Sequence, residues 1–121
     1  MPSPQGIDER SFDFLCGVIR FVRTIRTDPG IRRLIDQLVS AAGSIAANRQ
    51  EATSASSRRE FVRYNEIALR SAKESALWLS AFQVTGIGNA AKCAELLGEG
   101  QQLARILGSI VVNTKANVVQ R

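Results

Sequence analysis

Residues 34–75 constrain the fold of this chain most strongly, because one helical pattern ends and another begins within them. Apolar residues recur every three or four positions on both sides of a polar, serine-rich connection at residues 50–57. Ser57 and Glu60 follow with the spacing of a capping box, in which the serine hydroxyl accepts a hydrogen bond from the third backbone N–H of a helix. This stretch therefore predicts two long helices joined by a short turn.

Two further helices are predicted on either side of this stretch. Asp28 and Pro29 suit the N-cap and first position of the second helix, and Asn89 suits the N-cap of the fourth. Gly86 and Gly88 suit the end of the third. We expect helices at about residues 8–26, 29–50, 58–84 and 89–115, after a loose N-terminal arm at residues 1–7. Short connections then predict one all-α domain over residues 1–121, an antiparallel up-down-up-down four-helix bundle.

The composition agrees with a single helical domain. A chain of 121 residues has the size of one ordinary domain, and its 45% hydrophobic content is enough to build a packed core. Aromatic residues make up only 6%, so the chain is poor in the side chains that favour strands. These values favour close-packed helices over a sheet.

The first helix carries more apolar surface than one seam inside a single chain needs. Phe14 and Phe21 lie seven residues apart on one flank, outside the face that we expect to point inward. That flank is a candidate subunit contact. The predicted inner face consists of Phe12, Leu15, Val18, Ile19, Val22 and Ile25.

The third helix is apolar on both flanks. Val62 and Leu69 lie on one flank, and Ile67 and Trp78 lie on the other. Covering both flanks in so short a chain requires another subunit, so we expect a homo-oligomer whose interface includes these residues. The predicted inner stripe consists of Phe61, Tyr64, Ala68, Ser71, Ala72, Ser75, Leu79 and Phe82.

The cysteines and the apolar segments indicate the compartment. Cys16 and Cys93 lie far apart and have no metal-ligand spacing, which favours two free thiols in a cytoplasmic protein. A disulfide between the first and fourth helices is the alternative. Neither a signal peptide nor a membrane-spanning segment is visible, so we expect no membrane partner.

The chain contains no histidine, which removes the commonest routes to catalysis. Ser–His and Cys–His nucleophile pairs are excluded, as are the Glu-x-x-His ligands of di-iron bundles. Glu95 and Glu99 lie four apart on a helix, a spacing more typical of an exposed charge ladder than of an acid–base pair. We therefore expect neither an enzyme nor a cofactor or metal site.

Arginines are the remaining candidates for function. Lys and Arg total 16 against 11 Asp and Glu, a net charge of +5. The guanidinium group grips phosphate through two hydrogen bonds, so a cluster around the second turn predicts nucleic-acid binding. Exposed surface charge and salt bridges between subunits are the alternatives. The candidate phosphate ligands are Arg49, Arg58, Arg59, Arg63 and Arg70, of which Arg49 lies on the apolar stripe of its helix. A second cluster consists of Arg20, Arg23, Arg26, Arg32 and Arg33.

These features also carry a family resemblance. The chain resembles the four-helix-bundle proteins encoded in 23S rRNA intervening sequences, a family related to the accessory variability determinant of diversity-generating retroelements. The resemblance rests on Gln37-Leu38, Ala41 to Asn48, Glu51, Arg58 to Phe61, Ile67 to Leu69, Ser71-Ala72 and Glu74.

The resemblance implies a homopentamer around a central channel and no enzymatic activity. In the retroelement relatives, basic surfaces contact nucleic acid and a reverse transcriptase. The sequence departs from the family at Arg49, where an apolar residue is usual, at Arg70, where a small one is usual, and at Ala52, where glycine is usual. We therefore expect a non-enzymatic oligomer that binds RNA or DNA through arginine–phosphate contacts. A structural or adaptor oligomer that binds a protein is the alternative.

Overall fold

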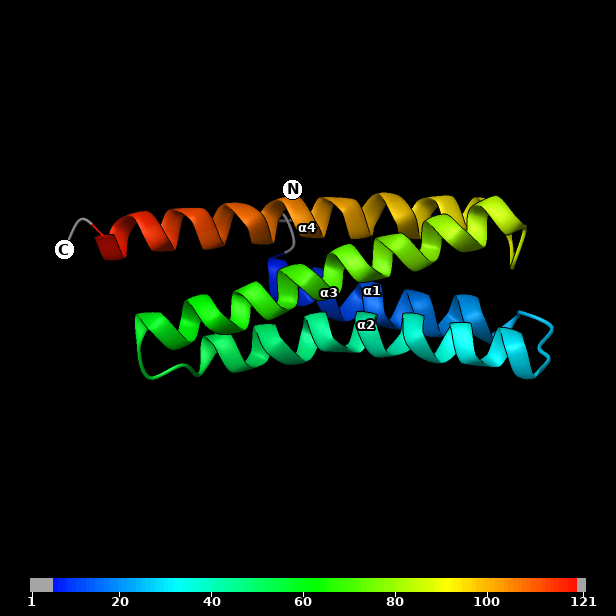
Figure 1. Ribbon diagram of the computed structural model, residues 1–121, viewed down its shortest axis with the longest axis horizontal. Helices are drawn as coiled ribbons and strands as arrows, with labels where there is room; N and C mark the ends of the chain where they lie inside the picture. The colour runs from blue at the N-terminus through cyan, green and yellow to red at the C-terminus, as the bar shows by residue number, and fades with distance from the viewer. Residues whose placement is uncertain (1–5, 120–121) are drawn as a thin grey trace, which may run out of the picture.

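The computed structural model describes residues 6–119, and within this range all regular secondary structure is helical. Figure 1 shows the helices packed as a bundle along a common long axis, with α1 beginning near the middle of its length. Residues 1–5 of the predicted arm lie outside the described range, and α1 already begins at Ile7. The elements are α1 (Ile7–Arg23), α2 (Pro29–Thr53), α3 (Arg58–Thr85) and α4 (Ala90–Val119).

The helix ends differ from the predicted ones by a few residues. α1 stops at Arg23 because the hydroxyl and the N–H of Thr24 both bond to the carbonyl of Phe21, at 2.8 and 3.3 Å. α2 continues to Thr53 because Ala52, in its last turn, is buried in the core. α4 continues to Val119 instead of ending near residue 115.

Side-chain caps start three of the helices, as predicted. Asp28, Ser57 and Asn89 cap α2, α3 and α4, and each side-chain oxygen accepts a bond from the N–H three residues on, at 2.8, 3.1 and 2.9 Å. The reciprocal half of the predicted capping box does not form. The carboxylate of Glu60 accepts a bond from the hydroxyl of Ser56 instead.

The glycines after α3 make the turn into α4, as predicted. Gly86 and Gly88 have φ angles of 73° and 82°, the left-handed region that favours glycine. A Cβ atom at Gly88 would lie 2.6 Å from Cζ of Phe21. The turn therefore needs glycine at residue 88 for both its backbone conformation and its packing.

Each helix packs against two neighbours, so the core lies along the centre of the bundle. α3 packs against α2 and α4, and α1 packs against the same two helices. The cluster of buried apolar side chains consists of Phe14, Val18, Phe21, Leu38, Ala42, Ile45, Ala68, Ala72, Leu79, Phe82, Cys93, Leu103 and Leu107.

The orientation of α1 corrects the prediction for its faces. Phe12 and Ile19, predicted to point inward, are 59% and 39% exposed. Phe14 and Phe21, predicted as a subunit contact, are instead buried within the chain, and the ring of Phe21 lies 6.3 Å from that of Phe82. These large rings fill the core, so they present no apolar surface to a second subunit.

α3 needs a smaller correction. Val62, predicted at the subunit interface, is buried in this chain, while Phe61 and Tyr64 of the predicted stripe are only half-buried. Leu69 and Trp78 pack against the core of the same chain. Both flanks are thus partly covered without a second subunit. An interface role for Leu69 and Trp78, and for the half-buried Ile67, stays a prediction.

Both cysteines are free thiols, as predicted, so the alternative of a disulfide between the first and fourth helices is wrong. Cys93 is buried, and its thiol donates a 3.3 Å hydrogen bond to the carbonyl of Leu79. Cys16 is half-buried on α1.

Candidate functional site

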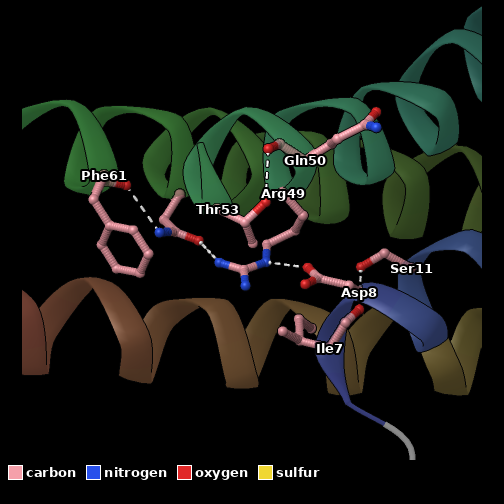
Figure 2. Close-up of polar contacts among 8 residues, drawn as sticks. Ile7, Asp8, Ser11, Arg49, Gln50, Thr53 and Phe61 are labelled. Atoms are coloured by element: carbon pink, nitrogen blue, oxygen red, sulfur yellow. Dashed lines mark hydrogen bonds and ion pairs between the residues drawn. The ribbon is translucent and has the colours of Figure 1, made fainter. Parts of the chain in front are cut away.

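Arg49 lies in the next-to-last turn of α2, and its side chain points into the bundle. Figure 2 shows it reaching towards Asp8 at the start of α1. Its Nε donates a 2.9 Å hydrogen bond to Oδ1 of Asp8, and its Nη1 donates one of 2.7 Å to Oδ1 of Asn65 on α3. Only 8% of the Arg49 side chain is exposed, against 56% of Asp8. The guanidinium is therefore a buried cation held by one accessible carboxylate and one buried amide.

Asn65 is positioned to accept this bond. Its Nδ2 donates a 2.8 Å hydrogen bond to the backbone carbonyl of Phe61, which turns Oδ1 towards Arg49. The ring of Phe61 lies 6.0 Å from Cζ of the guanidinium, within cation–π range. Asn65 was not among the residues predicted from the sequence. A signal for it exists, because an arginine on the apolar stripe of a helix requires a buried acceptor, and an asparagine on a facing helix can supply one.

This arrangement gives the Arg49 guanidinium its hydrogen-bond partners within the bundle. A buried cation is tolerated only when it is paired and hydrogen-bonded, and Asp8 and Asn65 meet that need. Nucleic-acid contact by Arg49 stays a prediction, because its side chain is bonded within the bundle in this structure. Its role here is to join α1, α2 and α3.

A second ion pair joins α1 to α4. Nη2 and Nε of Arg10 donate to the two carboxylate oxygens of Glu99 at 2.6 and 3.1 Å, and Nη2 also donates to Gln102 at 2.8 Å. The bond to Glu99 raises the pKa of Arg10 above its ordinary value. No local pattern in the sequence indicates this pair, because its members are 89 residues apart.

The other predicted phosphate ligands lie on α3 and are exposed. Arg59, Arg63 and Arg70 share its outer face, since spacings of four and seven residues return to one side of a helix. Arg58 opens the helix beside them. Arg70 is exposed, while the neighbouring Ser71 and Ala72 are buried on the inner face.

The acidic side chains on this part of α3 contact side chains other than these arginines. Glu60 accepts a bond from Ser56, Glu66 pairs with Lys115 of α4 at 3.1 Å, and Glu74 accepts a bond from the Trp78 indole N–H at 3.4 Å. We call Arg58, Arg59, Arg63 and Arg70 the α3 arginines. None of them forms an ion pair with a side chain that the structure describes.

Comparison with known proteins shows the family. The family model described as 23S rRNA-intervening sequence protein matches residues 6–109, which cover α1, α2 and α3 in full and α4 as far as residue 109. This chain belongs to that family. No curated protein matches it.

A solved structure shares the fold of this intervening-sequence protein. It is the crystal structure, at 1.70 Å resolution, of a protein of unknown function from the S23 ribosomal protein family of Bacteroides thetaiotaomicron VPI-5482. The two chains are 23% identical, with a TM-score of 0.77 over 88% of this chain and 98% of the other. At this identity the likeness concerns the fold alone.

The described part of this 23S rRNA-intervening sequence protein shows no other chemical centre. Across residues 6–119, no group of three or more Cys, Asp or Glu side chains could hold a metal ion. No described helix is long and apolar enough to cross a membrane. The second arginine cluster is exposed and is spread over α1, α2 and the turn between them. The α3 arginines differ from this second cluster in that all of them lie on one helix.

Proposed function

We propose that this protein is a non-enzymatic homo-oligomer, a pentamer of antiparallel four-helix bundles, that binds RNA or DNA through the α3 arginines. One observation carries the proposal: these side chains are exposed on one helix, and none of them is in an ion pair with a side chain that the structure describes. Their charge is therefore available to a polyanion.

The geometry suits a phosphate backbone. Arg59 and Arg70 are eleven residues apart, a rise of about 16 Å along a helix, and a strand of B-DNA places a phosphate every 3.4 Å or so along its axis. Each guanidinium can donate two hydrogen bonds to one phosphate. Arg58 and Arg59 also lie at the helix N-terminus, where free backbone N–H groups favour anions.

The expected binding has little sequence preference. Contacts to phosphate oxygens fix the position of a protein on nucleic acid but do not read the bases. Tyr64 is the one tyrosine of the chain, and it is half-buried, so its ring is not a free platform for stacking a base. We therefore expect similar affinities for oligonucleotides of different sequence.

An electrophoretic shift assay with mixed-sequence oligonucleotides tests the proposal. Replacing Arg58, Arg59 and Arg63 together by alanine should weaken binding at least tenfold, since charge-assisted hydrogen bonds contribute about 1.5–3 kcal/mol each. The matched control replaces Arg26, Arg32 and Arg33, which are exposed elsewhere and carry the same charge. Equal losses in the two variants would point to net charge alone, and an unchanged affinity in the first would refute the site.

A structural or adaptor oligomer that binds a protein is the second candidate, and an apolar surface favours it. Leu77 and Val84 continue the outer face of α3 beyond Arg70 and are exposed, with the exposed Ala81 between them. An exposed apolar stripe of this kind is typical of protein contacts. A reverse transcriptase, which the family resemblance implies, is among its candidate partners.

Light scattering combined with the shift assay separates the two candidates. A pentamer that binds oligonucleotides supports the first, and a pentamer that ignores nucleic acid at low salt supports the second. Replacing Leu77 and Val84 by serine should leave nucleic-acid binding unchanged in the first case.

A further inference from the structure

The first two turns of α1 are held to the bundle by charged side chains on both sides. Asp8 bonds to Arg49 of α2, and Arg10 bonds to Glu99 and Gln102 of α4. These two residues lie within one turn of each other, so the ion pairs grip the same short segment. We call residues 7–13 the α1 flap.

Apolar packing is weaker in the α1 flap than in the remainder of the helix. Ile7 packs against the core, but Phe12 is exposed, and the buried Ser11 uses its hydroxyl to bond to the carbonyl of Ile7 in the same segment. Phe14, Val18 and Phe21 follow and are all buried. Hydrophobic burial thus anchors the second half of α1, while ion pairs anchor the first.

Two glycines near this segment contribute little to the stability of the helix. The N-cap is Gly6, which makes no side-chain bond to the first turn. Gly17 lies beyond the flap inside α1, where an interior glycine costs about 1 kcal/mol of helix stability relative to alanine. Neither feature resists the local unwinding of residues 7–13.

From these observations we propose that the α1 flap is an ionic latch, which opens by losing the Asp8–Arg49 and Arg10–Glu99 pairs while the rest of the bundle stays folded. Asp8, which is more than half exposed, is the accessible partner in the first pair, so salt and water compete for it. Opening leaves Arg49 facing solvent. The latch therefore controls whether this buried arginine is accessible to an anion.

Hydrogen exchange of the full chain tests the latch. Raising NaCl from 0.1 to 1 M should speed exchange of the amides of residues 10–13 several-fold, because salt screens partly exposed ion pairs. Exchange at residues 18–23 and within α3 should not accelerate. Asp8→Asn and Glu99→Gln should each produce the fast exchange already at 0.1 M salt, by about tenfold, the equivalent of a lost charge-assisted hydrogen bond.

Asp36→Asn is the matched control, since Asp36 is an exposed aspartate on α2, and it should leave exchange in the flap unchanged. Salt titration of the unaltered protein provides a readout that does not depend on how the variants fold. If residues 10–13 exchange in step with residues 18–23 at every salt concentration, α1 opens as one unit and the latch does not exist. The same conclusion follows if Asp8→Asn and Asp36→Asn behave alike.

Discussion

Nε of Arg49 lies 2.9 Å from Oδ1 of Asp8, which joins the end of α2 to the beginning of α1. The two partners differ in environment, because the arginine is buried and the aspartate is more than half exposed. Losing the aspartate leaves Arg49 without its carboxylate partner, whereas losing the arginine releases a carboxylate into water. If the arginine is lost, the buried Oδ1 of Asn65 is left without a hydrogen-bond donor.

The first prediction concerns this buried amide. Arg49→Met should lower the free energy of unfolding by about 1–3 kcal/mol, the cost of leaving one buried polar atom unsatisfied. Arg49→Met combined with Asn65→Leu should recover most of that loss, because both polar partners are then replaced by apolar groups. Urea unfolding of the single and double variants measures the difference. A double variant that is less stable than Arg49→Met would contradict this account.

The second prediction concerns the cap of α3. Ser57→Ala should destabilise the protein by about 1 kcal/mol, because the N–H of Glu60 loses the serine oxygen that accepts its bond. Ser109→Ala, at an exposed position inside α4, is the control and should change stability by less than about 0.5 kcal/mol. Thermal unfolding followed by circular dichroism provides the comparison. Equal effects of the two changes would mean that the cap contributes nothing.

The third prediction contrasts two glycines. Gly88→Ala should cost more than about 1 kcal/mol, because alanine is strained at a φ of 82° and its Cβ would clash with Phe21. Gly98→Ala should instead stabilise the protein by up to about 1 kcal/mol, since Gly98 lies inside α4 with no heavy atom within 4 Å of an added Cβ. Denaturant midpoints of the two variants should shift in opposite directions, and shifts of the same sign would overturn the argument.

The fourth prediction follows from the buried thiol. Burial raises the pKa of Cys93 above its ordinary value of 9.0, so the folded protein keeps this thiol neutral. The neutral thiol of Cys93 contributes fully to the free energy of unfolding at a pH below its pKa in the unfolded chain. This contribution is lost as the pH rises from that pKa through the higher pKa of Cys93 in the folded protein. Unfolding midpoints should therefore fall less between pH 8 and pH 10 in Cys93→Ala than in the unaltered protein. Identical pH profiles would show that Cys93 is not the group responsible.

Reactivity gives a separate check on the two thiols. Cys16 is half-buried and Cys93 is fully buried. Because the thiolate is the reactive form, an alkylating reagent should modify Cys16 first and reach Cys93 only on unfolding. Mass spectrometry of the partly alkylated protein identifies the order, and early modification of Cys93 would contradict its placement in the core.

Local signals in the sequence predicted most of the fold. The caps at Asp28, Ser57 and Asn89 and the glycines at 86 and 88 depend on residues within a few positions, so they could be identified without knowing the packing. Four helices and the absence of strands among residues 6–119 followed from these signals and from the apolar spacing. The family resemblance pointed to the same four helices; the family match confirms the family, and the structure shows the four helices.

The rotation of α1 could not be predicted in the same way. Phe12 and Ile19 form one apolar pair spaced seven apart, and Phe14 and Phe21 form another. Because both pairs have the same spacing, periodicity alone does not show which pair is buried in the core. The space beside Phe82 accepts the ring of Phe21, and that contact exists only in the folded bundle.

The candidate site was predicted in part. The exposed arginines near the start of α3 follow from composition and from the cap at Ser57. The pairing of Arg49 with Asp8 and of Arg10 with Glu99 does not, because these partners lie 41 and 89 residues away along the chain. Such distant pairs are set by the packing of α1 against α2 and α4.

The salt dependence of oligonucleotide binding tests whether the α3 arginines contact phosphate. Fluorescence titrations of the unaltered protein and of a variant with Arg59, Arg63 and Arg70 replaced by alanine give the slope of log affinity against log salt. If these arginines contact phosphate, the slope should be steep and should fall by roughly 2 to 3 in the variant, since each lost phosphate contact contributes about 0.7 to 0.9. Binding that ignores salt, or an unchanged slope in the variant, would contradict such contact.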